Sequence, residues 1–182
     1  ASPFHDGQPQ IRKTLIEQKV RETKTHFIYC NLVGAQDELI FDGNSVVYNN
    51  KGEVIASAQS FSEDLVIVNM DSTNIISEQV FKREESLYSA LCLGVNDYFD
   101  KTGHKKAVMG LSGGIDSSLT ACIAADALGK ENVWGITMPS EFSSEHSVTD
   151  SEKLAQNLGI SVSSIPIEEL VNNTTQSLKP MF

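Results

Sequence analysis

The sequence has few basic residues, few cysteines and no long apolar run. Lysine and arginine together number 14 against 24 acidic residues, giving a formal net charge of -10, which disfavours a general nucleic-acid-binding surface. The three cysteines, Cys30, Cys92 and Cys122, form no CxxC pair, so neither a zinc site nor a disulfide framework is indicated. No apolar run approaches the roughly 20 residues that cross a bilayer, and residues 1–6 lack the layout of a signal peptide. We therefore expect a cytoplasmic protein without a membrane or nucleic-acid partner.

The first 70 residues predict one part of an α/β sandwich. A helix that begins near Pro9 should bury one apolar face and turn Arg12 outward. The residues of that apolar face recur at near-helical spacing: Ile11, Leu15, Ile16 and Val20. Residues 35–44 predict a polar loop. The predicted strands are residues 27–33, 45–48, 53–56 and 65–68, the middle two joined as a hairpin by Asn49-Asn50-Lys51-Gly52.

Residues 71–82 are rich in Ser, Thr, Asn and Glu and predict a linker, and residues 83–182 predict a second domain. A helix over about 87–99 should end near Gly103. The strands that follow are predicted at residues 107–111, 133–138 and 162–167, and the helices between them at residues 117–128 and 147–158. This alternation indicates crossover units on a parallel, doubly wound sheet, with ligands at the carboxyl ends of the strands.

One such strand end carries a glycine-rich turn: Gly110, Leu111, Ser112, Gly113, Gly114, Ile115, Asp116, Ser117 and Ser118. Its glycines let backbone amides approach an anion, and the following helix directs its positive end to the same point. The Walker pattern GxxxxGK[ST] is absent. Because a carboxylate repels bare phosphate, Asp116 is best explained as a ligand of Mg²⁺ that bridges phosphate oxygens.

The turn Ser112-Gly113-Gly114-Ile115-Asp116-Ser117 resembles the Ser-Gly-Gly-x-Asp-Ser loop of the ATP pyrophosphatases. That resemblance implies ATP and Mg²⁺ as cofactors, cleavage between the α- and β-phosphates, and adenylation of an acceptor. Residues 138–150 and 154–160 resemble the corresponding region of NAD synthetases, which implies that Met138 lies against adenine. From the residues alone, Ser147 and Asp150 are explained as a helix capping box.

Residues 1–4, 29–38 and 41–45 resemble the C-terminal part of a nitrilase-type glutaminase domain. That domain ahead of this pyrophosphate loop is the arrangement of the glutamine-dependent NAD synthetases, which implies deamido-NAD and glutamine as substrates and a homo-oligomer. The family's catalytic Glu, Lys and Cys would precede Ala1, so we expect a fragment without catalytic residues of its own. Ser2 and Gln8 match glutamine-binding positions, but Gln8 stands where relatives often carry a cation. Cys30 is expected to be buried in a strand.

Two alternatives remain at this point. The pyrophosphate loop also occurs in other ligases, such as GMP synthetase-like and tRNA-thiolating enzymes. The non-enzyme alternative is a nucleotide-binding fragment that turns over little or nothing by itself.

Overall fold

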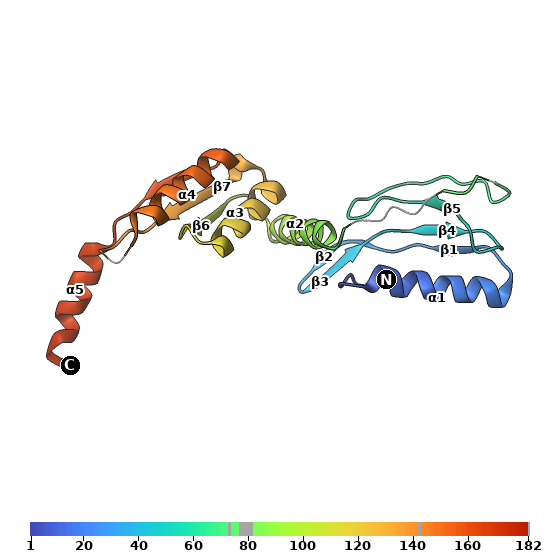
Figure 1. Cartoon of the computed structure of the whole chain (residues 1–182), viewed down its shortest axis with the longest axis horizontal. Helices are drawn as coiled ribbons and strands as arrows, with labels where there is room; N and C mark the ends of the chain where they lie inside the picture. Colours follow the sequence, from blue (N-terminus) through green and yellow to red (C-terminus); the bar gives the residue numbers. More distant parts are fainter. Residues whose placement is uncertain (73, 77–81, 142, 182) are drawn as a thin grey trace. The chain divides into compact units, whose positions relative to one another are not determined.

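The computed structural model shows two compact units, Ala1–Tyr98 and Phe99–Phe182 (Figure 1). It describes residues 1–72, 74–76, 82–141 and 143–181. Half of the predicted linker, at residues 73 and 77–81, lies outside these described ranges, so the proposed domain boundaries stay a prediction. The helix α2 (Arg83–Thr102) continues across the division at Tyr98. None of the helices in the described part of the chain is both long and apolar enough to span a bilayer.

The first unit packs the helix α1 against an antiparallel sheet. Its elements before α2 are α1 (Gln8–Thr23), β1 (Phe27–Tyr29), β2 (Val33–Gln36), β3 (Leu39–Asp42), β4 (Val46–Tyr48) and β5 (Val54–Ser57). The strand order is β1-β4-β5, and β2 pairs with β3 in a separate hairpin. Ile16 and Val20 of α1 form a buried cluster with Tyr48 and Val54 of the sheet. Burial of these four side chains is the apolar contribution that holds α1 on the sheet.

The predicted hairpin at 45–56 is confirmed. Val47 of β4 faces Ala56 of β5, and Gly52 adopts φ +85° in the connecting turn. The side chain of Asn49 closes this turn, because its Oδ1 accepts hydrogen bonds from the amides of Lys51 and Glu53, both at 3.0 Å. Turn chemistry therefore fixes the connection, as the sequence indicated.

Four expectations for this unit are wrong. Residues 35–44 are not a loop, because most of them form the β2–β3 hairpin, whose turn places Asp37 at φ 51°. Residues 65–68 form no strand and leave Ile67 93% exposed. On α1, Arg12 is buried while Ile11 and Leu15 are largely exposed, because Arg12 pairs with a buried carboxylate. The strand predicted at residues 27–33 ends at Tyr29, so Cys30 lies just beyond β1 and is exposed.

The second unit is built on a parallel sheet. After α2, its elements are β6 (Ala107–Gly110), α3 (Ile115–Leu128), η1 (Lys130–Asn132), β7 (Val133–Thr137), α4 (Glu145–Leu158), β8 (Ser161–Ser164), α5 (Glu168–Leu178) and η2 (Lys179–Met181). The strand order is β6-β7-β8 with parallel pairing throughout. The predicted alternation of strands and helices is confirmed. The helix α5 has no counterpart in the sequence prediction.

Alanines allow the helices to pack closely on this sheet. Ala121 on α3 is fully buried and Ala155 on α4 is 1% exposed, and both belong to one cluster with Leu111 and Val133. Because α3 and α4 share this cluster, they cover the same face of the sheet. The opposite face carries Val108 and Trp134, which are 67% and 50% exposed.

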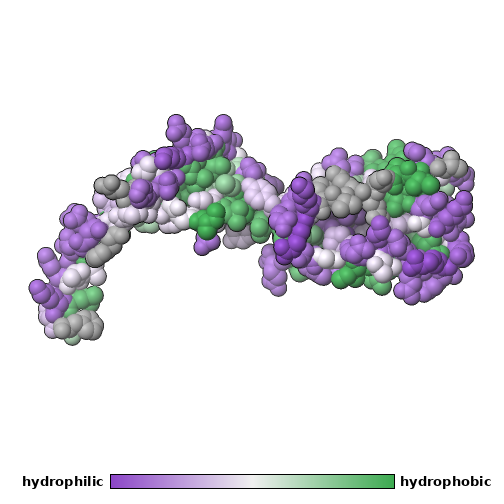
Figure 2. Space-filling view, in the orientation of Figure 1, coloured by the Kyte–Doolittle hydropathy of each residue, from purple (hydrophilic) through white to green (hydrophobic). Residues whose placement is uncertain are grey.

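Hydrophobic surface is visible on both units in Figure 2.

In the second unit, the described helices α3 and α4 cover a single face of the sheet. The structure therefore shows an α/β fold with a parallel sheet, whereas helices on both sheet faces, as in a doubly wound domain, are not among the elements in the described ranges.

The ion pair between Arg12 and Asp42 dominates the polar interior of the first unit. The Arg12 guanidinium donates to both carboxylate oxygens, at 2.8 and 3.2 Å, and the side chains are 9% and 2% exposed. Removing one partner leaves the other charge buried without compensation.

We expect Asp42→Ala to lower the free energy of unfolding by about 3–5 kcal/mol, measured by urea denaturation. The matched control is Asp6→Ala, which removes the exposed pair between Asp6 and Arg83 and should cost no more than about 1 kcal/mol. Equal losses for the two variants would contradict the importance of the buried pair.

Candidate functional site

The predicted glycine-rich turn lies between β6 and α3, at the carboxyl end of the parallel sheet. Gly110 ends the strand, and the amide of Leu111 continues the pairing by donating to the carbonyl of Ile136 at 2.8 Å. The side chain of Leu111 is buried in the core, whereas Ile115 is 80% exposed on the first turn of α3. Leu111 therefore anchors the turn to the hydrophobic core of the second unit.

Gly113 is required by its conformation and by its surroundings. Its φ is +76°, and a Cβ at this position would lie 2.6 Å from the carbonyl oxygen of Ser147 and 2.7 Å from its Cα. Contacts shorter than 3.0 Å with backbone cannot be relieved by a side-chain rotation, so any larger residue would displace the turn from α4. Gly113 thus allows the turn after β6 to lie against the start of α4.

The first turn of α3 exposes backbone amides at the end of the glycine-rich turn. Gly114 is the N-cap residue and, as a glycine, has no side chain to cap the helix. The first helical bond runs from Ser118 N to Gly114 O at 3.1 Å. The amides of a helix's first turn lack intrahelical acceptors and carry partial positive charge. An anion at this point would accept hydrogen bonds from them.

The serines of the turn hold its backbone. Ser117 Oγ and Ser118 Oγ both donate to the carbonyl of Gly114, at 3.1 and 2.8 Å. Ser112 Oγ accepts from the amide of Gly114 and lies 3.1 Å from Ser117 Oγ. Three predicted ligand hydroxyls therefore stabilise the loop conformation in this structure.

Asp116 lies exposed on the first turn of α3. Among the described residues, no group of three or more His, Cys, Asp and Glu side chains is placed to hold a metal ion. Mg²⁺ is commonly bound through one or two carboxylates together with substrate phosphates and waters. A single accessible carboxylate beside a turn that presents backbone amides fits that mode of binding.

A cavity of about 470 Å³ adjoins the turn. It is lined by Gly110, Leu111, Ser112, Thr137, Met138, Pro139, Ser143, Ser144, Ser147 and Val148. Met138 is 52% exposed here, so it does not belong to the core. Thr137 was missed by sequence reasoning: it is 3% exposed, and its hydroxyl has no hydrogen-bond partner among the described residues.

The predicted capping box on Ser147 is wrong. α4 begins two residues earlier than predicted, and its N-cap is Ser144, whose side chain accepts from the amide of Ser147 at 3.2 Å. Serine is a favoured N-cap residue, and Ser144 takes this position three residues before Ser147. The shift places Ser147 on the helix, where its carbonyl meets Gly113.

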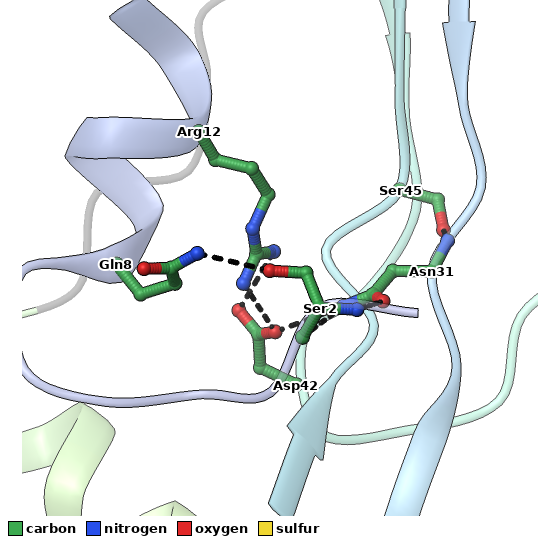
Figure 3. Close-up of polar contacts among 6 residues, drawn as sticks. All are labelled: Ser2, Gln8, Arg12, Asn31, Asp42 and Ser45. Atoms are coloured by element: carbon green, nitrogen blue, oxygen red, sulfur yellow. Dashed lines mark hydrogen bonds and ion pairs between the residues drawn. The ribbon is translucent and has the colours of Figure 1, made fainter. Parts of the chain in front are cut away.

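A second polar cluster lies in the first unit (Figure 3). The structure brings together the two predicted residues, because Gln8 Nε2 donates to Ser2 Oγ at 3.0 Å. It also adds Asn31, Asp42 and Arg12, which the sequence did not single out. Gln8 and Arg12 are four residues apart on α1, so they share one face of that helix.

The Arg12 charge in this cluster is already neutralised. Asp42 accepts hydrogen bonds from both terminal nitrogens of the guanidinium. The Arg12 carbon Cζ lies over the Tyr29 ring, 5.4 Å from the ring centroid. Burial raises the pKa of the Tyr29 phenol, so it stays a neutral donor at physiological pH. Within the described residues, Arg12 Nε has no hydrogen-bond partner. Arg12 and Tyr29 both line a cavity of about 290 Å³.

The fold and the turn define an α/β domain with a glycine-rich strand-to-helix turn at the carboxyl end of its parallel sheet, the place where such sheets bind phosphate-bearing ligands. Residues 87–181 match the family described as NAD synthase. The chain belongs to this family.

Several relatives match over the whole chain. The chain is 45% identical to the glutamine-dependent NAD(+) synthetase of Synechocystis sp. and 37% identical to that of Thermotoga maritima, covering 34% and 38% of those proteins. The solved glutamine-dependent NAD+ synthetase of Acinetobacter baumannii, in complex with ADP, superposes on the entire chain with a TM-score of 0.94 at 37% identity, over 36% of its own length. The chain thus spans about a third of the length of these relatives.

We expect Gly113→Ala to abolish binding of inorganic pyrophosphate to the turn, measured by isothermal titration calorimetry. The matched control is Gly103→Ala, because Gly103 has nearly the same φ, +75°, and a Cβ added there would meet nothing within 4 Å. Both substitutions should cost on the order of 1 kcal/mol of stability through backbone strain, but only the first meets Ser147. Unchanged pyrophosphate binding by Gly113→Ala would contradict the role of this close approach.

Proposed function

We propose that the full-length protein containing this chain is a glutamine-dependent NAD synthetase. It would use ATP to amidate deamido-NAD with ammonia released from glutamine, forming NAD, AMP and pyrophosphate. The observation that carries the proposal is the geometry of the turn between β6 and α3: a helix start capped by no side chain, a glycine held against Ser147, and a carboxylate on the first turn. Membership in the NAD synthase family supports the choice of acceptor.

In this proposal the turn binds the phosphates of ATP. The amides at the start of α3 donate hydrogen bonds to the β- and γ-phosphates, and Met138 at the end of β7 lies against adenine. Asp116 holds Mg²⁺, which supplies neutralisation of phosphate charge when bound. The predicted ATP-binding set is Gly110, Leu111, Ser112, Gly113, Gly114, Ile115, Asp116, Ser117, Ser118 and Met138.

The chemistry proceeds in two displacements. A carboxylate oxygen of deamido-NAD attacks the α-phosphorus of ATP, the bond to the β-phosphate oxygen breaks, and pyrophosphate leaves. Ammonia then attacks the acyl carbon, AMP leaves, and the nitrogen loses a proton to give the amide. The chain's contribution is to hold pyrophosphate as its charge develops, through amides fixed in position before the reaction.

The first unit is proposed to be the C-terminal part of a nitrilase-like glutaminase, with Ser2 and Gln8 at the glutamine site. Gln8 Nε2 donates to Ser2 Oγ, which leaves the Ser2 hydroxyl proton for an acceptor on the substrate. The charge of Arg12 is compensated by Asp42, so glutamine would be held here by neutral hydrogen bonds. The catalytic Glu, Lys and Cys would come from outside this chain.

The remaining expectations are part of the same proposal: a doubly wound synthetase domain, a cytoplasmic location and a homo-oligomer. The rival ligases are separated by measuring pyrophosphate release against deamido-NAD, XMP and tRNA. Release with XMP or tRNA alone would favour a GMP synthetase-like or tRNA-thiolating enzyme. Comparing this chain with the full-length protein tests whether the chain by itself is catalytically incomplete.

We expect Asp116→Ala in the full-length protein to lower kcat for ATP-dependent NAD formation by at least about a hundredfold, the range in which single charge-stabilising groups act. The control is Asp126→Ala, which removes an exposed carboxylate from the last turn of the same helix and should leave kcat unchanged. A near-normal rate for Asp116→Ala would refute the metal role.

We expect Ser2→Ala to raise the KM for glutamine by about tenfold, the effect of losing one or two substrate hydrogen bonds. NAD formation driven by added ammonia should be unaffected, because ammonia bypasses the glutamine site. The two activities are compared in the same preparation by following NAD, and an equal loss in both would show that Ser2 does not act on glutamine.

A further inference from the structure

We propose that Asn31 is a positioning residue of the glutamine site: its side-chain amide grips both backbone polar groups of Ser2 and so sets the direction of the Ser2 hydroxyl. The inference rests on the proposed function, because it concerns how Ser2 is held for glutamine. No sequence pattern singled out Asn31 for this role.

Asn31 bonds both backbone polar groups of Ser2. The Ser2 amide donates to Asn31 Oδ1 at 2.8 Å, and Asn31 Nδ2 donates to the Ser2 carbonyl at 3.2 Å. A side-chain amide offers the same donor and acceptor as a peptide group, so Asn31 pairs with Ser2 as a neighbouring strand would. Two bonds from one amide group to the N–H and the C=O of the same residue fix the direction in which its side chain leaves the backbone.

Asn31 is itself fixed from both ends. Its backbone amide donates to Ser45 Oγ at 3.0 Å, and its Nδ2 also donates to Asp42 Oδ1 at 3.1 Å. Asp42 is in turn held by both terminal nitrogens of Arg12. Because Asn31 is 9% exposed and Asp42 2%, water competes little for these bonds.

The contacts close into a ring (Figure 3). It runs from Gln8 on α1 to Ser2, then to Asn31, to Asp42, and back to Arg12 one turn further along α1. Ser2 carries the one hydroxyl among these five side chains, and that hydroxyl accepts from Gln8 while it can still donate its own proton. The ring therefore presents one hydroxyl in one orientation, and Asn31 is the member that touches its backbone.

The N-terminal segment that contains Ser2 and Phe4 does not depend on Asn31 alone for its attachment to the first unit. The amide of Phe4 donates to the carbonyl of Ile40 at 2.6 Å, which ties residues near Ser2 to β3. Loss of the Asn31 side chain should thus free the orientation of Ser2 while the segment stays in place. This separates a positioning role from a purely structural one.

The test uses the full-length protein with the variants Asn31→Ala, Ser2→Ala and the double variant. We expect Asn31→Ala to raise the KM for glutamine at least about fivefold, within the range for losing hydrogen bonds to a buried group, with kcat and ammonia-driven NAD formation nearly unchanged. Because Asn31 acts through Ser2, the double variant should match Ser2→Ala alone. Multiplying effects, or a KM equal to wild type, would overturn the proposal.

The matched control is Asn49→Ala. Asn49 is also 9% exposed and also bonds backbone amides, but in the β4–β5 turn. It should lower the unfolding temperature without changing the KM for glutamine. A KM rise as large as that of Asn31→Ala would show that any buried asparagine in this unit has the effect and would overturn the proposal.

Asn31→Ser covers the case in which Asn31→Ala does not fold. It keeps a small polar group at the buried position but is too short to reach both backbone groups of Ser2. We expect a raised KM for glutamine in a folded protein, and an unchanged KM would overturn the proposal. If wild-type protein forms no NAD from deamido-NAD with either nitrogen source, the proposed function fails first, and that result is distinct from all of these.

Discussion

The close approach of Gly113 to Ser147 is the constraint on which the second unit's site depends. A peptide backbone can lie this near another only where no Cβ intervenes, and here a Cβ would sit 2.6 Å from a carbonyl oxygen. The approach brings the end of β6 against the start of α4, which closes one side of the cavity beside Met138. The proposed anion site therefore depends on packing as much as on the residues that would touch a ligand.

The first unit solves a different physical problem, the burial of charge. Arg12 and Asp42 compensate one another, and Asp42 also receives a hydrogen bond from Asn31. A buried pair of this kind adds little stability compared with apolar packing, but it is costly to break and specifies one arrangement of its neighbours. Here the neighbours include Ser2 and Gln8, so the same ring that satisfies the buried charges shapes the proposed glutamine site.

Much of the second unit could be predicted from the sequence, because strand–helix alternation and glycine stops are local patterns. The turn at 49–52 was predictable for the same reason. Arg12 was misplaced because periodicity treats an arginine as an outward residue, and its partner Asp42 lies 30 residues away. The β2–β3 hairpin was missed because its two short strands are partly polar. Asn31 had no local pattern at all: its role exists only once Ser2, Asp42 and Ser45 have been brought around it.

The most direct test of the central claim is the stoichiometry of products from the full-length protein given ATP, deamido-NAD and ammonia. Cleavage at the α-phosphate through an adenylated intermediate predicts NAD, AMP and pyrophosphate in equal amounts, resolved by anion-exchange chromatography. Formation of ADP and inorganic phosphate, or release of pyrophosphate without NAD, would contradict the account.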